Sequence, residues 1–207
     1  MPTMMSFKRS HLNVLACGIA VGLVSASCSS GGSSPANAFV TSTLGFAVDS
    51  QGQVIGNCTT QSSDDTPLLT IGTAANPVPN AGNYMGTQVS VVCQVQATGT
   101  DTYTVNAQIS EGNTGGFNFS GTLTNTMGMQ GPFQAGFTQG VNSYDETDCT
   151  VALGMEGFTS SGAVSTTDPS ITAGRVRAML VCPMLVQPED NDVCHGSATF
   201  VLQNCVD

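Results

Sequence analysis

Apolar and polar side chains alternate along most of this chain, and a period of two is the pattern of a β-strand with one buried face. The clearest run is Val89, Val91, Cys93, Val95 and Ala97, and similar runs follow at residues 103–109, 117–123, 133–137, 149–155, 176–182 and 198–202. Turns rich in Gly, Asn, Asp and Ser separate the runs, and no segment has a helical period. The pattern predicts an all-β domain, either a β-sandwich or a jelly roll.

The N-terminal part of the β pattern is less regular. A hairpin is expected around residues 49–52, between short apolar runs at residues 46–48 and 54–55. Residues 59–82 have the weakest pattern of the β region and contain several Pro and Gly residues. We expect this stretch to be a long surface excursion with one short strand at residues 68–71.

Six cysteines lie within the predicted β region, and an even number in an exported chain indicates three disulfides with fifteen alternative pairings. They are Cys58, Cys93, Cys149, Cys182, Cys194 and Cys205. A metal site is the weaker interpretation, because the spacings are wide and no C-x-x-C pair occurs. Cys205 is out of phase with the last apolar run. We therefore expect it just beyond the end of that strand, bonded to Cys182 or Cys194.

The N-terminus has the features of an export signal. Lys8 and Arg9 precede an apolar run that is shorter than the roughly 20 residues of a membrane span, and small residues then lead to Cys28. The segment resembles a bacterial lipoprotein signal, in which the cysteine becomes the acylated first residue. We expect a signal peptide at residues 1–27, lipidated Cys28 with a flexible tether to residue 38, and a single β domain at residues 39–207.

The predicted cleavage site and the predicted location each have an alternative. Ordinary signal cleavage after Ala38 is the alternative, because Ala36 and Ala38 place small residues at the right offsets. Ser29 follows the predicted lipidated cysteine, and in the lipoproteins that this segment resembles a residue other than Asp favours the outer membrane. The predicted location is therefore the outer membrane or cell surface, with a periplasmic or secreted protein as the alternative.

The predicted mature chain is strongly acidic. The basic residues of the whole sequence are Lys8, Arg9, Arg175 and Arg177, so the mature chain keeps two arginines against fourteen carboxylates, a net charge of −12 with no lysine. Such a surface disfavours nucleic acid and anionic lipid, so membrane contact is expected through acyl chains. Arg175 and Arg177 should share the outer face of one strand. Pairing with neighbouring carboxylates is preferred there over docking of an acidic ligand.

The sequence offers little for catalysis. His195 is the single histidine of the mature chain and is expected in a turn before the last strand, where a structural role is the better interpretation. A nucleophile elbow, a catalytic lysine and a phosphate-binding loop are all missing from the sequence. A hydrolase that uses paired carboxylates stays open, but Glu111 and Glu156 lie in predicted turns and no acidic pair stands out. We therefore expect a protein that is not an enzyme.

Two binding hypotheses rest on residue clusters. Oxygen ligands for calcium could come from two acidic clusters in predicted loops, although solvated loop charges are the preferred interpretation. These clusters are Asp145, Glu146 and Asp148, and Glu189, Asp190 and Asp192. A cavity for an apolar cargo could be lined by Met127, Met129, Phe133 and Phe137, although ordinary sheet core is preferred for them. No other cofactor is expected.

Three segments of the chain resemble secreted or lipid-anchored proteins of myxobacteria that have no assigned activity. The segments are residues 91–95, 173–183 and 194–205, and the resemblance implies a shared disulfide-linked β domain. The resemblance brings no activity. The export signal, the composition and the lack of a catalytic motif predict a non-enzymatic interaction or structural module of the cell envelope, with a protein or glycan partner and contact loops at the sheet ends. A carbohydrate-binding module is a more specific version of this prediction. Against it, sugar-binding sites usually use aromatic residues, and this chain has no Trp and only Tyr84, Tyr103 and Tyr144 as amphipathic aromatics.

Overall fold

A computed structural model describes residues 34–59, 67–126, 128–153, 170–189 and 192–207, and within these ranges every regular element is a β-strand. The long strands are β1 (Asn37–Val48), β6 (Thr87–Gly99), β7 (Thr102–Glu111), β8 (Gly115–Thr124), β9 (Gly128–Gln139), β10 (Asn142–Leu153), β12 (Arg175–Gln187) and β13 (Asp192–Gln203). The short strands are β2 (Val54–Ile55), β3 (Leu69–Ile71), β4 (Val78–Pro79), β5 (Asn83–Tyr84) and β11 (Ile171–Thr172). The predicted all-β class is confirmed.

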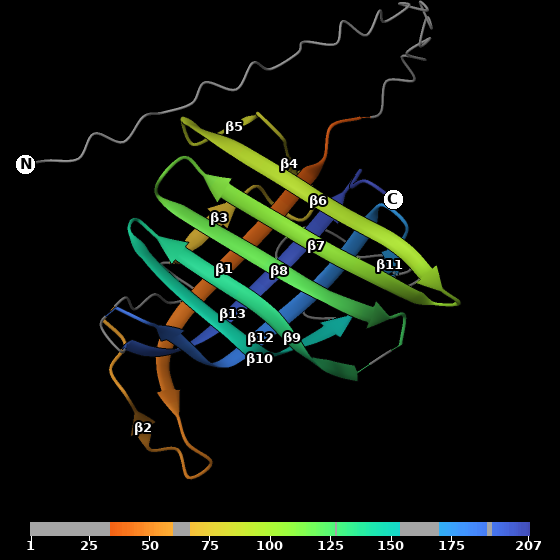
Figure 1. Cartoon of the computed structure of the whole chain (residues 1–207). Helices are drawn as coiled ribbons and strands as arrows, with labels where there is room; N and C mark the ends of the chain where they lie inside the picture. The colour runs from red at the N-terminus through yellow and green to blue at the C-terminus, as the bar shows by residue number, and fades with distance from the viewer. Residues whose placement is uncertain (1–33, 60–66, 127, 154–169, 190–191) are drawn as a thin grey trace, which may run out of the picture. The chain divides into compact units, whose positions relative to one another are not determined.

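The strands form one antiparallel sheet in the order β2-β1-β13-β12-β10-β9-β8-β7-β6-β5. Strands β6 to β10 follow one another as a meander, and β1 pairs with β13, the last strand of the chain. The sheet folds over on itself, so that β6 to β9 form one layer and β1, β13 and β12 cross behind them (Figure 1). Strand β10 joins the two layers, and its register with β9 shifts between Glu146 and Cys149. Such irregularities bend a strand.

The core lies between the two layers and is rich in phenylalanine. Phe200 of β13 contacts Phe117 and Phe119 of β8, with ring centroids 5.3 Å and 5.6 Å apart. Phe137 packs on Phe117, and Phe133 packs on Phe119. Each such pair contributes on the order of 1 kcal/mol beyond its buried area. The core role predicted for Phe133 and Phe137 is therefore confirmed.

The other two residues of the predicted apolar group behave differently. Met129 is 55% exposed, so the expectation that it belongs to the core or lines a cavity is wrong. It lies in register with Ala152 on the outer side of the sheet, because a register shift between Phe133 and Gln130 breaks the alternation that would otherwise put Met129 on the same side as Phe133. Met127 lies outside the described residues.

Both edges of the long-stranded sheet are covered by short segments. The edge of β1 pairs with β2, β3 and β4. On the edge of β6, Val91 N donates to Asn80 Oδ1 at 2.9 Å, and Val95 N donates to the carbonyl of Val206 at 2.9 Å. The carbonyl of Val95 accepts a hydrogen bond from Gly174 N at 2.8 Å. Covered edges remove the backbone groups through which sheets aggregate.

Three disulfides connect parts of the chain that are far apart in sequence, as predicted: Cys58–Cys194, Cys93–Cys205 and Cys149–Cys182. The position of Cys205 beyond the end of β13 is confirmed, but its predicted partners, Cys182 and Cys194, are wrong. After β13 the chain turns at Asn204, which has a positive φ of 54°, and Val206 then lies parallel to Gln94 of β6. This turn places Cys205 against Cys93, a neighbour that strand phase alone does not identify.

Three local predictions can be compared with the strands at the N-terminal end of the domain. The hairpin at residues 49–52 is confirmed, because Val48 pairs with Val54. The strand expected at residues 68–71 is β3, but the excursion also contains a second strand, β4, that was not predicted. Strand β1 begins at Asn37, two residues before the predicted start of the domain, and Ala38 is fully buried.

Candidate functional site

The outward side chains of β6 to β9 form rows of uncharged polar groups. In one row, Gln94, Asn106, Ser120 and Gln134 lie in register across the four strands. In the next row, Val92, Gln108 and Asn118 lie in register. We call this surface the amide face, made of Val92, Gln94, Asn106, Gln108, Asn118, Ser120 and Gln134.

The amide face follows from the alternation that builds the core. Val91, Cys93 and Val95 point inward and are buried, so the residues between them point to solvent. Strands β7 and β8 repeat the pattern with buried Ala107 and Phe119. The polar residues between the apolar ones therefore indicate this face in the sequence, whereas the predicted sites all lie at charged or apolar residues.

No residue of the amide face carries a charge. Charged residues make up 9% of the whole chain, and fourteen of them are carboxylates. Asp145 marks the margin of the face, because it lies in register with Gly136 beyond Asn118. The carboxylate of Asp145 thus lies at the border of the amide face and not within it.

The amide face is hollowed into a shallow groove that is open to solvent. The groove is lined by all seven residues of the amide face together with Cys93, Ala107, Phe119 and Val206. A second open hollow continues beyond Ser120 and Gln134, which belong to both, and it includes Gln130, Pro132 and Thr147. The two hollows together cross the whole layer of β6 to β9.

Most amide groups of the groove are free to bind a ligand. Ser120 Oγ donates to Asn106 Oδ1 at 2.8 Å, which orients that amide. Within the described residues, the side chains of Gln94, Gln108 and Gln134 make no hydrogen bond with another residue. Each primary amide offers two N–H donors and a carbonyl acceptor. The groove therefore presents several unoccupied donors and acceptors to one ligand.

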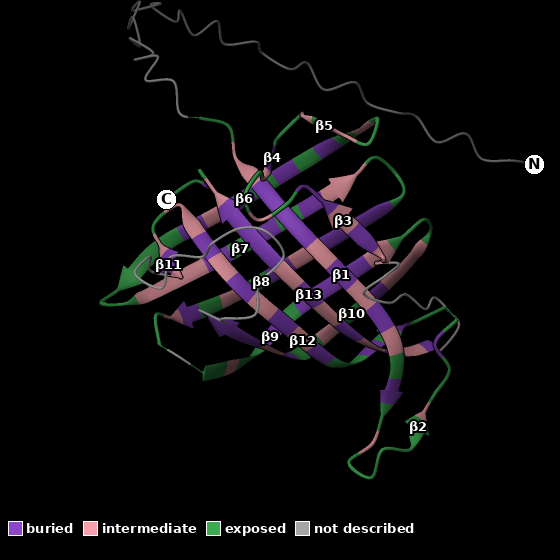
Figure 2. Ribbon diagram, turned by 180° about the vertical axis from the view of Figure 1, so that it is seen from behind, coloured by how far each residue is buried: buried purple, intermediate pink, exposed green. Residues whose placement is uncertain are grey.

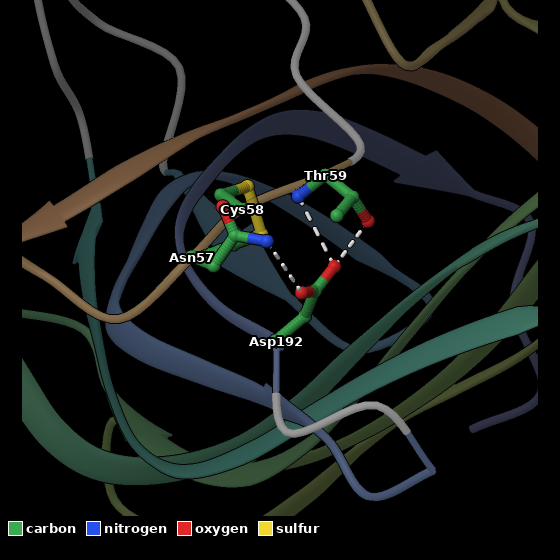
Figure 3. Close-up of a disulfide and its surroundings, with 5 residues drawn as sticks. Asn57, Cys58, Thr59 and Asp192 are labelled. Carbon is green, nitrogen blue, oxygen red and sulfur yellow. Dashed lines mark hydrogen bonds between the residues drawn. A yellow bond between two sulfur atoms is a disulfide. The ribbon is translucent and has the colours of Figure 1, made fainter.

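A second polar centre lies at Asp192, at the start of β13, and Figure 3 shows its partners. Thr59 donates to Asp192 Oδ2 from its backbone N–H at 3.1 Å and from its hydroxyl, and Asn57 Nδ2 donates to Oδ1 at 3.5 Å. The Cys58–Cys194 disulfide lies directly beside these bonds. Asp192 is 2% exposed, so these donors compensate a buried carboxylate. This arrangement fixes residues 57–59 on β13.

The acidic residues predicted as calcium ligands do not form one site in the described part of the chain. Asp145, Glu146 and Asp148 lie within β10, so their predicted placement in a loop is wrong. The Glu146 carboxylate accepts hydrogen bonds from Thr147 N at 2.7 Å and Asp148 N at 3.0 Å. A sequence rich in turn-forming acids continues as a strand here because both of its neighbours, β9 and β12, pair with it.

The acids of the second predicted cluster also do not form one site among the described residues. Glu189 is exposed, Asp192 is buried in the bonds described above, and Asp190 lies outside the described residues. In the ranges that the structure describes, no group of three or more His, Cys, Asp or Glu side chains could hold a metal ion. Calcium binding stays a prediction.

The residues considered for catalysis are scattered. His195 lies inside β13 opposite Gly45, so its predicted position in a turn is wrong. Glu111 ends β7, and Glu156 lies outside the described residues. Arg175 and Arg177 share the outer side of β12, as predicted, between buried Val176 and Ala178. Among the described strand pairs, Arg175 lies in register with Thr172 of β11 and Arg177 with Val201 of β13.

No protein-family model, curated protein or solved structure matches the chain. No helix in the described ranges is long and apolar enough to cross a membrane. The resemblance to myxobacterial envelope proteins therefore stays a prediction, and the amide face is the surface from which a function can be argued.

Proposed function

We propose that this protein is a non-enzymatic binding module of the bacterial cell envelope, and that its amide face binds a neutral polysaccharide. Three disulfides indicate an oxidising compartment outside the cytosol. Anchoring at the outer membrane through lipid on Cys28 belongs to the same proposal. It rests on the small residues before that cysteine and on Ser29 after it.

The observation that carries the proposal is the groove of uncharged, unpaired amides. A sugar hydroxyl donates and accepts hydrogen bonds, and a primary amide can match both at once. An anionic polymer would meet a chain with an excess of carboxylates, and a cation would be drawn to those carboxylates and away from the amide face. A neutral, hydroxylated ligand fits the amide face best.

Apolar contact in the groove supports the same ligand class. Val92 is 63% exposed and Val206 is 67% exposed, and both line the groove beside Gln94. Ligand sites usually combine apolar contact with a small number of polar groups that fix orientation. These valines can cover the C–H face of a sugar ring, a task that other proteins give to aromatic residues.

The proposal is tested by titrating the folded, oxidised protein with neutral glucose hexasaccharides of α- and β-linkage, and with an oligogalacturonate as charged control. Isothermal titration calorimetry should show saturable binding to a neutral sugar and none to the charged one. Because the expected contacts are hydrogen bonds, binding should persist in 0.5 M NaCl, whereas charge-driven binding would weaken. Failure of every neutral sugar to bind would refute this ligand class.

Two other predicted functions gain no support from the described residues. The space between the layers is filled by side chains, namely Phe117, Phe119, Phe133, Phe137 and Phe200. This packing gives no support to the hypothesis that the protein carries an apolar ligand between the layers. The groove of the amide face contains no carboxylate, so it offers no pair for a hydrolase. Both functions stay predictions.

A further inference from the structure

The four residues before Phe39 are part of the folded domain. Ala38 is fully buried and lies in register with Leu202 of β13 on one side and with Val78 of β4 on the other. Asn37 pairs in the same way with Gln203 and Pro79. Figure 2 shows this first part of β1 as buried and intermediate ribbon among β3, β4 and β13. The first two residues of β1 thus hold two separate strands.

Hydrogen bonds extend this attachment to Pro35 and Ala36. Asn80 N donates to the carbonyl of Ala36 at 2.7 Å, and Asn204 Nδ2 donates to the carbonyl of Pro35 at 3.1 Å. Asn80 also accepts a hydrogen bond from Val91 N at 2.9 Å, so Ala36 is linked to the edge of β6. Asn204 is the turn residue that leads to Cys205. Residues 35–38 therefore connect β4, β6 and the C-terminal segment.

From this attachment we infer that the export signal is removed upstream of Pro35, and that the small-residue site formed by Ala36 and Ala38 is not used. Hydrolysis of the Ala38–Phe39 bond would leave Ala38 on the released signal and a new amino group on Phe39. The domain would then lack every contact that residues 35–38 make. Hydrolysis before Cys28 leaves all four residues in the mature chain.

This inference rests on the proposed export of the protein, but it is independent of the ligand and of lipid attachment. The two alternative cleavage sites differ in how much stability the mature domain loses. Cleavage after Ala38 removes two paired residues and two hydrogen-bonded carbonyls, which we expect to lower the melting temperature by ~5 °C or more for a domain of this size. Cleavage before Cys28 has no such cost.

The test is intact mass spectrometry of the full-length protein, expressed with its own signal in a Gram-negative bacterium and purified from the membrane and soluble fractions. The inference predicts a mature chain that begins after the apolar run, which ends at Val24, and at or before Pro35. A chain that begins at Phe39 would overturn it. Acyl mass on the same molecule is read separately: a chain that begins before Pro35 without lipid would refute the anchor in the proposed function and leave this inference standing.

An Ala36→Leu variant tests directly whether the site after Ala38 is used, because cleavage there requires a small residue at position 36. The inference predicts processing of the variant at the same bond and to the same extent as the wild type. Accumulation of the uncleaved precursor in this variant, with normal processing of the wild type, would overturn it. Ala97→Leu, at an exposed position of β6, is the matched control for the added bulk.

Discussion

The bond between Cys93 and Cys205 fixes the C-terminal segment along the edge of β6, where Val95 N donates to the carbonyl of Val206. This contact covers part of one free edge of a sheet whose other edge is covered by β2, β3 and β4. This disulfide thus lowers the conformational entropy of the unfolded chain and also protects the sheet edge.

Removing this disulfide should cost more stability than removing the bond between neighbouring strands. Cys93 and Cys205 are 112 residues apart, and Cys149 and Cys182 are 33 apart. Loop entropy alone makes the longer link more stabilising by ~1 kcal/mol. We expect the Cys93→Ala/Cys205→Ala variant to unfold at lower urea concentration than the Cys149→Ala/Cys182→Ala variant. The reverse order would show that loop length does not govern these bonds.

Asp192→Ala should loosen the attachment of Thr59 and the Asn57 side chain to β13, while the Cys58–Cys194 disulfide stays in place. The substitution leaves the Thr59 N–H and the Asn57 amide without their acceptor, and a lost charge-assisted network of this kind costs about 1–3 kcal/mol. Amide hydrogen exchange at Thr59 should accelerate together with the loss of stability in urea. Glu189→Ala, an exposed acid in the preceding turn, is the matched control. Unchanged exchange at Thr59 would contradict the role given to Asp192.

Gly121→Ala should disturb the packing between the layers. A methyl group at Gly121 would overlap the ring of Phe133, which also packs on Phe119. Overpacking of a filled core typically costs about 1–3 kcal/mol. Gly45→Ala is the control, because no heavy atom lies within 4 Å of its added methyl group. Thermal unfolding of the two variants should differ by several degrees, and equal melting temperatures would refute the packing described for Phe133.

Replacing amides of the groove should remove binding and leave the fold intact. In the variant Gln94→Ala/Gln108→Ala/Gln134→Ala, three ligand hydrogen bonds of roughly 0.5–1.5 kcal/mol each are lost, so affinity for a neutral hexasaccharide should fall at least tenfold. Stability should change little, because these side chains make no hydrogen bond with another described residue. The control variant Gln51→Ala/Asn113→Ala/Gln139→Ala changes exposed amides elsewhere and should bind like the wild type. Equal loss in both variants would exclude the groove as the site.

The strands could be predicted because a period of two is a local signal. Alternation at residues 89–97 and 103–109 gives the buried face of β6 and β7 without any knowledge of their neighbours. The same phase gives the core positions of Phe133 and Phe137, but it also places Met129 on that side, and only the register shift between Phe133 and Gln130 turns Met129 outward.

Contacts between distant segments could not be predicted in this way. The pairing of Cys205 with Cys93 depends on the turn at Asn204 and on where the sheet closes, and neither leaves a pattern near Cys205. Strand β4 ends in Pro79, a residue typical of loops, and is held by β1 from far along the chain. The acids of β10 indicate a loop by composition, and only the strands on both sides make this segment part of the sheet.

The amide face could have been found from the sequence in part. Its residues are the outward positions of four successive alternating runs, and Gln94, Asn106 and Asn118 can be assigned to that side from phase alone. Their alignment into rows requires the strand register, which depends on the turns between β6, β7 and β8. The groove, with Val206 from the C-terminal segment, requires the complete fold.

The most direct test of the proposed function is NMR titration of the oxidised protein with a neutral glucose hexasaccharide, observing the side-chain amide resonances. The account predicts shifts concentrated in Gln94, Asn106, Gln108, Asn118 and Gln134, which saturate together with one affinity. Saturating shifts that avoid these amides and map to another surface would contradict it, and so would unchanged spectra with every neutral hexasaccharide of the α- and β-linked series.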